Sequence, residues 1–163
     1  MTLDMLRAEL DHEAKTTRKL VERVPDDRLD WKPHARSFSL GGLASHIVDC
    51  FQWGDAILNG DEYDFDPATH RSHQATSAVD LVARLDSLAA RCREALARAD
   101  EERMLMPWRL KIRGRQRFER PRVVVLRDFT LSHLIHHRGQ LSVYLRLLDV
   151  PVPGAYGPSA DDA

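Results

Sequence analysis

The stretch that decides the fold is Leu131–Leu141, LSHLIHHRGQL, which places three of the chain's eight histidines within five residues. Successive residues of a helix are about 100° apart, so His133 and His137 lie one turn apart on one face. Large apolar residues on either side share that face, which predicts that both imidazoles point into the interior. His136 falls to one side, and Arg138 is predicted to face outward. Two histidines at this spacing are a recurrent way to bind a metal from a helix, although hydrogen-bonded core or surface histidines give the same pattern.

The same helical spacing of apolar residues recurs along the rest of the chain. It predicts four helices, at about residues 3–24, 39–58, 77–99 and 121–148. Ser39 is the predicted N-cap of the second helix, and Ser77 or Thr76 that of the third. Four helices with short to medium connections predict an all-α protein, a four-helix bundle that forms a single domain over residues 1–163.

The segment before the last helix, residues 106–122, has a different pattern, MPWRLKIRGRQRFERPR. Trp108, Leu110 and Ile112 alternate with basic residues, and Arg113-Gly114 is a plausible turn. This segment is therefore predicted to be a short extended arm or a hairpin.

The composition, 43% hydrophobic and 30% charged over 163 residues, is ordinary for a folded soluble protein. The N-terminus lacks the apolar stretch of a signal peptide, and no apolar run approaches the ~20 residues that span a bilayer. We therefore expect a cytoplasmic protein with no membrane partner. A net charge of −1 argues against nucleic acid as a partner. Cys50 and Cys92 do not form a CxxC motif, and a disulfide is not expected.

The charges are unevenly distributed along the chain. Residues 38–70 contain six acids and no Lys or Arg, whereas residues 103–127 contain nine basic residues and one acid. Either the two segments neutralise each other, within the fold or between subunits, or the basic segment forms an electropositive rim that attracts an anionic small molecule.

A third histidine, His46, falls within the apolar stripe of the second helix. A lone buried imidazole is unfavourable without a polar partner, and convergence of His46, His133 and His137 on one metal ion would satisfy all three. Three histidines leave coordination positions open, as a catalytic metal requires. Zinc, nickel and ferrous iron all accept such ligands. Cys50, one turn after His46, is either a further ligand or a small core residue.

Three other polar residues are candidates for the same site. Glu13 lies on the apolar stripe of the first helix, where it is either a solvated residue at the mouth of the bundle or a general base for a metal-bound water. Gln140 and Tyr144 lie beside the histidines on the last helix. Each is a candidate for lining a cofactor or substrate pocket, with core packing or a satisfied amide as the alternative.

Two segments of the chain resemble a known family. PHARSFSLGGLASHI, residues 33–47, and LSHLIHHRGQLSVYLRLLDVPVPGAYGPSADD, residues 131–162, are similar to the DinB family of damage-inducible bacterial proteins, within the DinB/YfiT-like group. The resemblance implies a four-helix bundle with a three-histidine metal site. Carried onto this sequence, the implied ligands are His46, His133 and His137, whereas His136 is not a ligand. It also implies chemistry with a low-molecular-weight thiol, because relatives are thiol-dependent transferases or isomerases.

Three functions are therefore compared. The first is a divalent-metal enzyme that transfers a thiol cofactor to a small electrophilic substrate, since metal coordination deprotonates a thiol near neutral pH. The second is a metal-dependent hydrolase of a small substrate, with Glu13 or water as base. The third is a stress-response protein in which the metal is structural and no reaction is catalysed.

Two further expectations concern packing. Gly41 and Gly42, in the first turn of the second helix, predict a close approach of another chain segment to the helix start. Val124, Leu131 and Ile135 form a second apolar stripe on the last helix, opposite the histidines. Either the basic arm or the tail of the same chain covers this stripe, or a two-fold partner does, and we expect the partner and therefore a homodimer.

Overall fold

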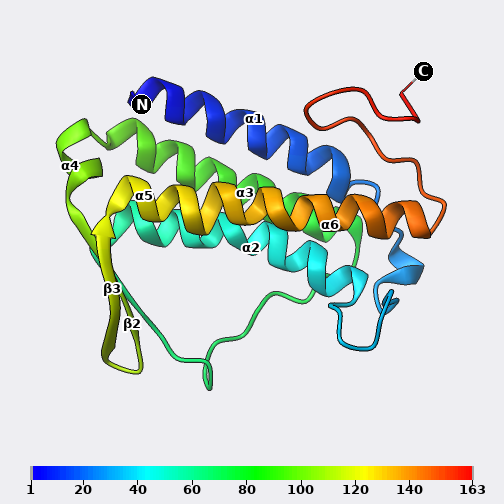
Figure 1. Cartoon of the computed structure of the whole chain (residues 1–163), viewed down its shortest axis with the longest axis horizontal. Coiled ribbons are helices and arrows are strands. Elements are labelled where there is room, and N and C mark those ends of the chain that lie inside the picture. The colour runs from blue at the N-terminus through cyan, green and yellow to red at the C-terminus, as the bar shows by residue number, and fades with distance from the viewer. Residues whose placement is uncertain (1, 163) are drawn as a thin grey trace.

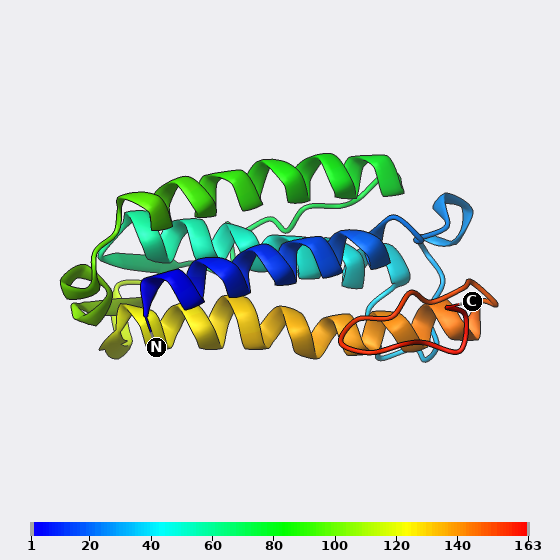
Figure 2. The same cartoon turned by 90° about the horizontal axis from the view of Figure 1, so that it is seen from above.

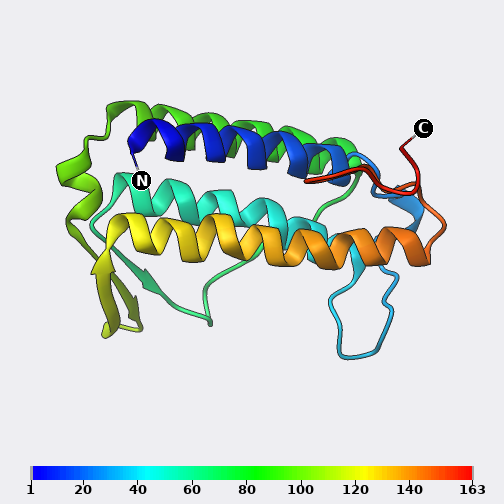
Figure 3. The ribbon, with the colours of Figure 1, turned by 45° about the horizontal axis from the view of Figure 1, so that its top comes forward.

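The computed structural model describes residues 2–162 and is dominated by four long helical segments that lie side by side (Figure 1). Their elements are α1 (Leu3–Val21), α2 (Leu40–Asn59), α3 (Ala78–Arg98) and a final segment made of α5 (Arg122–Leu126), η2 (Arg127–Ser132) and α6 (His133–Leu147). Figure 3 shows them in two layers, with α1 and α3 above α2 and the final segment. The four segments enclose one apolar core, to which each contributes buried leucines.

The helix starts follow the serines that the sequence indicates. The Ser39 hydroxyl accepts a hydrogen bond from Gly42 N at 3.1 Å, and the Ser77 hydroxyl accepts one from Asp80 N at 3.0 Å. Both bonds satisfy amide groups that have no partner within the first turn of a helix. Two short helices, η1 (Asp26–Arg28) and α4 (Glu101–Leu105), lie in connections that the sequence pattern left irregular.

A three-stranded sheet lies at one end of the helices, so the expectation of an all-α protein is wrong in this respect (Figure 1). The predicted hairpin is present: β2 (Pro107–Ile112) pairs antiparallel with β3 (Arg115–Pro121). Both turn residues, Arg113 and Gly114, have positive φ, of 50° and 74°, as tight hairpin turns require. The third strand, β1 (Glu62–Phe65), pairs parallel with β2 and was not predicted.

The sheet also neutralises the uneven charge along the chain. Acids of β1 and its flanks pair with basic residues of the hairpin, with Lys111 Nζ 2.6 Å from Glu62 and Arg113 Nε 3.0 Å from Asp66. Arg122, whose side chain is almost fully buried, pairs with Asp61 at 2.6 Å and donates to the main-chain oxygens of Ile57, in α2, and of Gly60, which follows α2. Neutralisation within the fold thus accounts for much of the charge on this segment.

The final segment is not a regular α-helix, because residues Arg127–Ser132 form a π-helix. Hydrogen bonds in a π-helix span one residue more than those of an α-helix, so each turn holds an extra residue. Before it, Arg122 and Leu126 are buried, and after it the buried residues are Leu134, Arg138, Leu141 and Leu145. The inserted residue moves the buried stripe from the line of His133 and His137 to the next residue along.

This shift overturns two expectations about the last helix. Arg138, predicted to face outward, is 2% exposed, and Leu131, predicted to lie on an outer apolar stripe, is fully buried within one chain. The apolar stripe on which the homodimer was predicted is therefore not exposed to solvent at Leu131. The histidines, in turn, lie at the edge of the core and are partly exposed.

A close approach of another chain segment explains the first of the two glycines at the start of α2, but not the second. A Cβ on Gly41 would lie 3.2 Å from Leu29 Cβ and Leu29 O, so the segment before α2 does approach the helix start, as predicted. A Cβ on Gly42 would meet only residues of its own turn, Ser39 at 3.1 Å and Phe38 at 3.9 Å. No helix within residues 2–162 has the length and apolar character needed to cross a membrane.

Candidate metal centre

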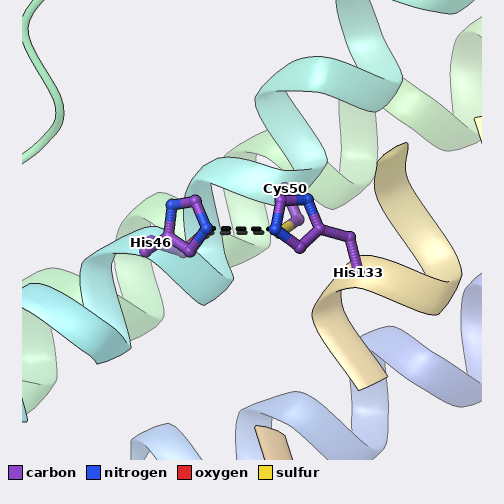
Figure 4. Close-up of side chains that lie close together, drawn as sticks. All are labelled: His46, Cys50 and His133. Carbon is purple, nitrogen blue, oxygen red and sulfur yellow. Dashed lines mark hydrogen bonds between the residues drawn. The ribbon is translucent and has the colours of Figure 1, made fainter. Parts of the chain in front are cut away.

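The three predicted histidines come together between α2 and the start of α6. The ring centroids of His46 and His133 are 5.0 Å apart, those of His46 and His137 4.6 Å, and those of His133 and His137 4.8 Å. His46 Nε2 faces His133 Nε2 at 3.3 Å, as the dashed line in Figure 4 shows. Side chains from two helices, 87 residues apart in sequence, therefore meet at one point.

Cys50 lies beside this pair. One ligand atom from each of His46, Cys50 and His133 falls within 4.8 Å of the others (Figure 4). The Cys50 thiol is buried, and it donates a hydrogen bond to the main-chain oxygen of His46 at 3.4 Å. Burial raises the pKa of this thiol to about 12, so it is protonated at neutral pH in the absence of a metal.

Neighbouring groups fix the orientation of the two imidazoles on the last helix. His137 Nδ1 donates to Gln140 Oε1 at 2.8 Å, which leaves Nε2 as the free ring nitrogen, and the Gln140 amide bridges onward to His136 Nε2 at 3.2 Å. The His133 ring hydrogen-bonds to the main chain of Phe129, within the π-helix. Histidine ligands of metals typically donate their second N–H to such an acceptor, which fixes the ring and its tautomer.

The electrostatics of the cluster favour neutral imidazoles. Burial, together with the neighbouring His137 and His133, lowers the pKa of His46 to about 4. Burial is also the main cause that lowers the pKa of His133 and of His137. Neutral imidazole is the form that binds a metal, so the cluster is in the binding form at neutral pH without having to lose a proton.

Two of the three histidines, His46 and His133, border a large cavity of about 890 Å³. This volume lies within the range of about 300–1,000 Å³ that is usual for small-molecule sites. His46 and His133 line it, together with Phe38, whose ring stacks on His46 with centroids 5.6 Å apart and planes at 19°. A half-exposed aromatic ring thus covers one side of the histidine cluster.

Glu13 lies elsewhere. Its carboxylate is 2.6 Å from the Arg138 guanidinium, and Tyr156 of the C-terminal tail donates to it at 2.8 Å. Figure 2 shows this tail against α1 and the end of α6. Glu13 is buried, as the pattern of the first helix indicated, but its partners among the described residues are these two, and it does not line the cavity.

Gln140 and Tyr144 act next to the cluster without lining the cavity. Gln140 holds His137, as described above. The Tyr144 hydroxyl donates to the main-chain oxygen of Phe38 at 3.3 Å, and its ring packs edge-on against Trp31. Tyr144 thereby links the last helix to the segment that carries Phe38.

Sequence reasoning missed most of the cavity wall. Asp49 is 8% exposed, lines the cavity, and is paired with Arg84 of α3 at 2.8 Å. The connection between β1 and α3 is attached to the same carboxylate through His73 N at 3.2 Å, and His70 of this connection also lines the cavity. The spacing of His46 and Asp49, three residues apart on one helix face, was the available signal for Asp49. Nothing in the sequence indicated where the loop lies.

Known proteins resemble the chain over nearly its full length. The uncharacterized protein YrdA of Bacillus subtilis (strain 168) is 27% identical over 161 residues, which are 99% of this chain and 92% of that protein. A DinB-like protein from Bacillus cereus ATCC 10987 has 22% identity and a TM-score of 0.67, covering 90% of this chain and 92% of that one. The DinB-like protein YjoA of Bacillus subtilis has 20% identity and a TM-score of 0.69, covering 90% and 95%.

The two solved structures share the fold, with the same arrangement over nine-tenths of the chain. The model of the DinB family matches residues 2–163. This match includes α2 with His46 and the whole of the final helical segment with His133 and His137. The chain therefore belongs to the DinB family.

Proposed function

We propose that this protein is a cytoplasmic, divalent-metal-dependent enzyme that activates a low-molecular-weight thiol for transfer to a small electrophile. His46, His133 and His137 are the proposed metal ligands. We also propose that the four long helical segments form a four-helix bundle. The observation that carries the proposal is the proximity of three neutral imidazoles, two of which line a large cavity.

The spacing of the ring nitrogens fits a metal. Two nitrogens bound to one zinc-like ion at about 2.0–2.1 Å in tetrahedral geometry are about 3.3 Å apart. His46 Nε2 and His133 Nε2 are 3.3 Å apart. These two side chains therefore need little rearrangement to hold such an ion, and zinc, nickel and ferrous iron all suit imidazole ligands.

His137 is a better candidate than Cys50 for the third ligand. Its Nε2 is free because Nδ1 donates to Gln140, and its ring is 4.6 Å from that of His46. The Cys50 thiol is buried and donates to the main chain of its own helix. Three histidines also leave the metal with at least one position for a substrate, as catalysis requires.

A metal ion held by His46, His133 and His137 would supply a lowered pKa to a small thiol bound beside it, which would make that thiol nucleophilic at neutral pH. The chain's own residues supply position and environment. Gln140 and the main chain of Phe129 hold two of the imidazoles in place, and Phe38 shields the cluster from bulk water. Neither Cys50 nor Cys92 is a suitable nucleophile, because burial raises the pKa of both thiols to about 12.

The hydrolase alternative keeps only water as its base, since Glu13 is held by Arg138 and Tyr156 and does not line the cavity. A structural metal is also less suited to this site, because the histidines lie at the edge of a core that is made of apolar residues. We therefore propose the thiol reaction alone.

The metal assignment is tested by metal analysis of protein purified without chelators or an affinity tag. We expect one divalent ion per chain in the unmodified protein, and a loss of at least tenfold in occupancy for His46→Ala, His133→Ala and His137→Ala. His136→Ala and Cys50→Ser are matched controls that keep the ion. Full occupancy in His137→Ala, or its loss in Cys50→Ser, would make Cys50 the third ligand.

The reaction is tested by following thiol consumption with 1-chloro-2,4-dinitrobenzene as electrophile and a panel of cysteine-derived small thiols. We expect consumption above the uncatalysed rate with metal-loaded protein, and none with His46→Ala. Turnover of hydrolysable esters or amides without any added thiol, and no thiol consumption, would replace this proposal with the hydrolase.

A further inference from the structure

The end of the cavity away from Phe38 is lined by four aromatic rings. Trp53 of α2 is the centre, with ring centroids 5.0 Å from Tyr63, 6.1 Å from Phe65 and 5.8 Å from Phe129. These rings come from α2, from β1 and from the π-helix, so three separate elements build one aromatic wall. All four are only partly buried, which leaves ring surface open to the cavity.

The charged side chains around this wall are already paired. Asp55 forms an ion pair with Arg91 at 2.5 Å, and Asp49 forms one with Arg84 at 2.8 Å. Arg84 also donates to Gln52 at 2.6 Å. A cationic ligand would find aromatic rings here but no unpaired carboxylate among these residues, and an anionic ligand would have to displace an aspartate to reach Arg84 or Arg91. The lysine of the cavity, Lys32, comes from the segment before α2 and not from the elements that build this wall.

The aromatic wall and the histidine cluster lie at different positions along α2. Trp53 is seven residues after His46. At a rise of about 1.5 Å per residue, the two lie about 10 Å apart along the helix axis. This is about the length of a fused two-ring aromatic system with one substituent. A ligand of that size can therefore reach both ends of the cavity.

From these observations we infer that the cavity binds a small molecule with a neutral, planar aromatic portion. That portion lies against Trp53, Tyr63, Phe65 and Phe129, with the reacting group about 10 Å away at His46. Offset or edge-on contacts with these rings contribute beyond the burial of apolar area. The inference deepens the proposed function by naming the class of its electrophilic substrate, and it rests on that function for the position of the reacting group. Binding of the aromatic portion itself does not require the metal.

The experiment is isothermal titration of metal-free protein with 2-naphthol and with its saturated counterpart, decahydro-2-naphthol. We expect saturable 1:1 binding of 2-naphthol, and binding of the saturated alcohol weaker by roughly threefold to tenfold, the range of an aromatic contact energy. Trp53→Leu keeps an apolar side chain but removes the ring face, and should weaken 2-naphthol binding roughly tenfold. Trp31→Leu, outside the cavity lining, is the matched control and should leave the affinity unchanged.

Thermal unfolding of each variant checks that it is folded. If Trp53→Leu does not fold, Tyr63→Leu on β1 is the replacement test, with the same expected loss of affinity. Absence of saturable 2-naphthol binding by the unmodified protein, or equal affinity in a folded Trp53→Leu or Tyr63→Leu variant, overturns the inference. His46→Ala separates the two proposals, because it should lose metal yet keep 2-naphthol binding. Absence of metal binding by the unmodified protein would refute the metal centre but not the aromatic binding site.

Discussion

Glu13 and Arg138 form an ion pair that is almost completely removed from solvent, with side-chain exposures of 4% and 2%. Arg138 also donates to Thr17, and Tyr156 donates to Glu13, so the hydrogen-bonding groups of the pair are well satisfied. Breaking a buried pair leaves one charge without compensation in the core, which is far less favourable than losing a surface pair. The pair therefore has a structural role in holding α1, α6 and the tail together.

Glu13→Gln should lower the free energy of unfolding by about 3–5 kcal/mol, because the Arg138 charge stays buried without its partner. Glu9→Gln, on the same helix, is the control. It removes a half-exposed pair with Arg127 and should cost no more than about 1 kcal/mol. Urea denaturation measures both, and metal analysis should give unchanged occupancy. If the Glu13→Gln protein is stable but has lost its metal, Glu13 contributes to metal binding.

The histidine cluster predicts how the metal-free protein responds to acid. The pKa of His46 is about 4 in the folded chain, below its ordinary value of 6.5. Between these values the unfolded chain binds more protons than the folded one, so stability rises with pH there. Stability from the neutral form is complete above about pH 6.5 and is lost as pH falls toward 4. Urea midpoints over this range should fall as the pH is lowered, and the slope should be smaller in His46→Gln. Equal slopes in the two proteins would contradict the assignment.

At the level of single residues, the sequence was informative where spacing alone was needed. His46, His133 and His137 were identified from helical periodicity, and they do converge. Arg138 was placed on the wrong side, because no periodic pattern shows that a helix is interrupted. Phe38, in a stretch without periodicity, was missed for the same reason: its contact with His46 depends on the path of a loop.

Helix glycines differ in what surrounds them, and this decides the effect of adding a methyl group. Gly139 lies in α6 with open space around its Cα, so Gly139→Ala should stabilise the protein by about 1 kcal/mol through helix propensity alone. Gly41→Ala gains the same propensity but places a Cβ 3.2 Å from Leu29 Cβ and main-chain oxygen. Overpacking of this kind costs about 1–3 kcal/mol, so a net loss is expected. Thermal unfolding of the two variants gives the comparison, and stabilisation by both would show that Leu29 yields without strain.

Most of the helices and strands could be predicted from the sequence, but strand β1 could not. The long helices and their serine caps follow from local sequence, and so does the hairpin around Arg113-Gly114. Strand β1 was not predicted, although Tyr63 and Phe65 alternate with acids in the pattern of a half-buried strand. Its partner β2 is more than forty residues away, and four residues of alternation are too few to stand out without that partner.

The whole chain should remain folded without metal. Its core is apolar, and the histidines lie at the edge of that core. A ligand at 100 times its dissociation constant stabilises a protein by about 2.7 kcal/mol, which for a chain of this size corresponds to roughly 5–10 °C in Tm. Chelation should lower Tm by this amount while the far-ultraviolet circular dichroism at 25 °C is unchanged. Loss of the helical signal on chelation would instead indicate a structural metal.

Association between chains is a separate proposal. Leu131 is buried, but Val143 and Leu147, one turn apart on α6, are 56% and 58% exposed. We propose that a two-fold partner covers this part of α6 in a homodimer. Light scattering should give twice the 18.6 kDa mass of one chain, and Leu147→Glu should give the single mass. A mass of 18.6 kDa for the unmodified protein at micromolar concentration would rule the homodimer out.

The π-helix has a consequence that is easiest to express in the gene. Its extra residue corresponds to one codon, which the wide turn accommodates without rotating the residues that follow it. Deleting the codon for Asp128, an exposed residue of the π-helix, would leave the reading frame intact and restore an uninterrupted α-helix. Leu134 and Arg138 would stay on the buried face, and both histidines of the last helix would keep their place at the edge of the core. A regular α-helix that kept every codon would instead turn His133 and His137 into the apolar core, so the wide turn allows the gene one additional codon without displacing the candidate ligands.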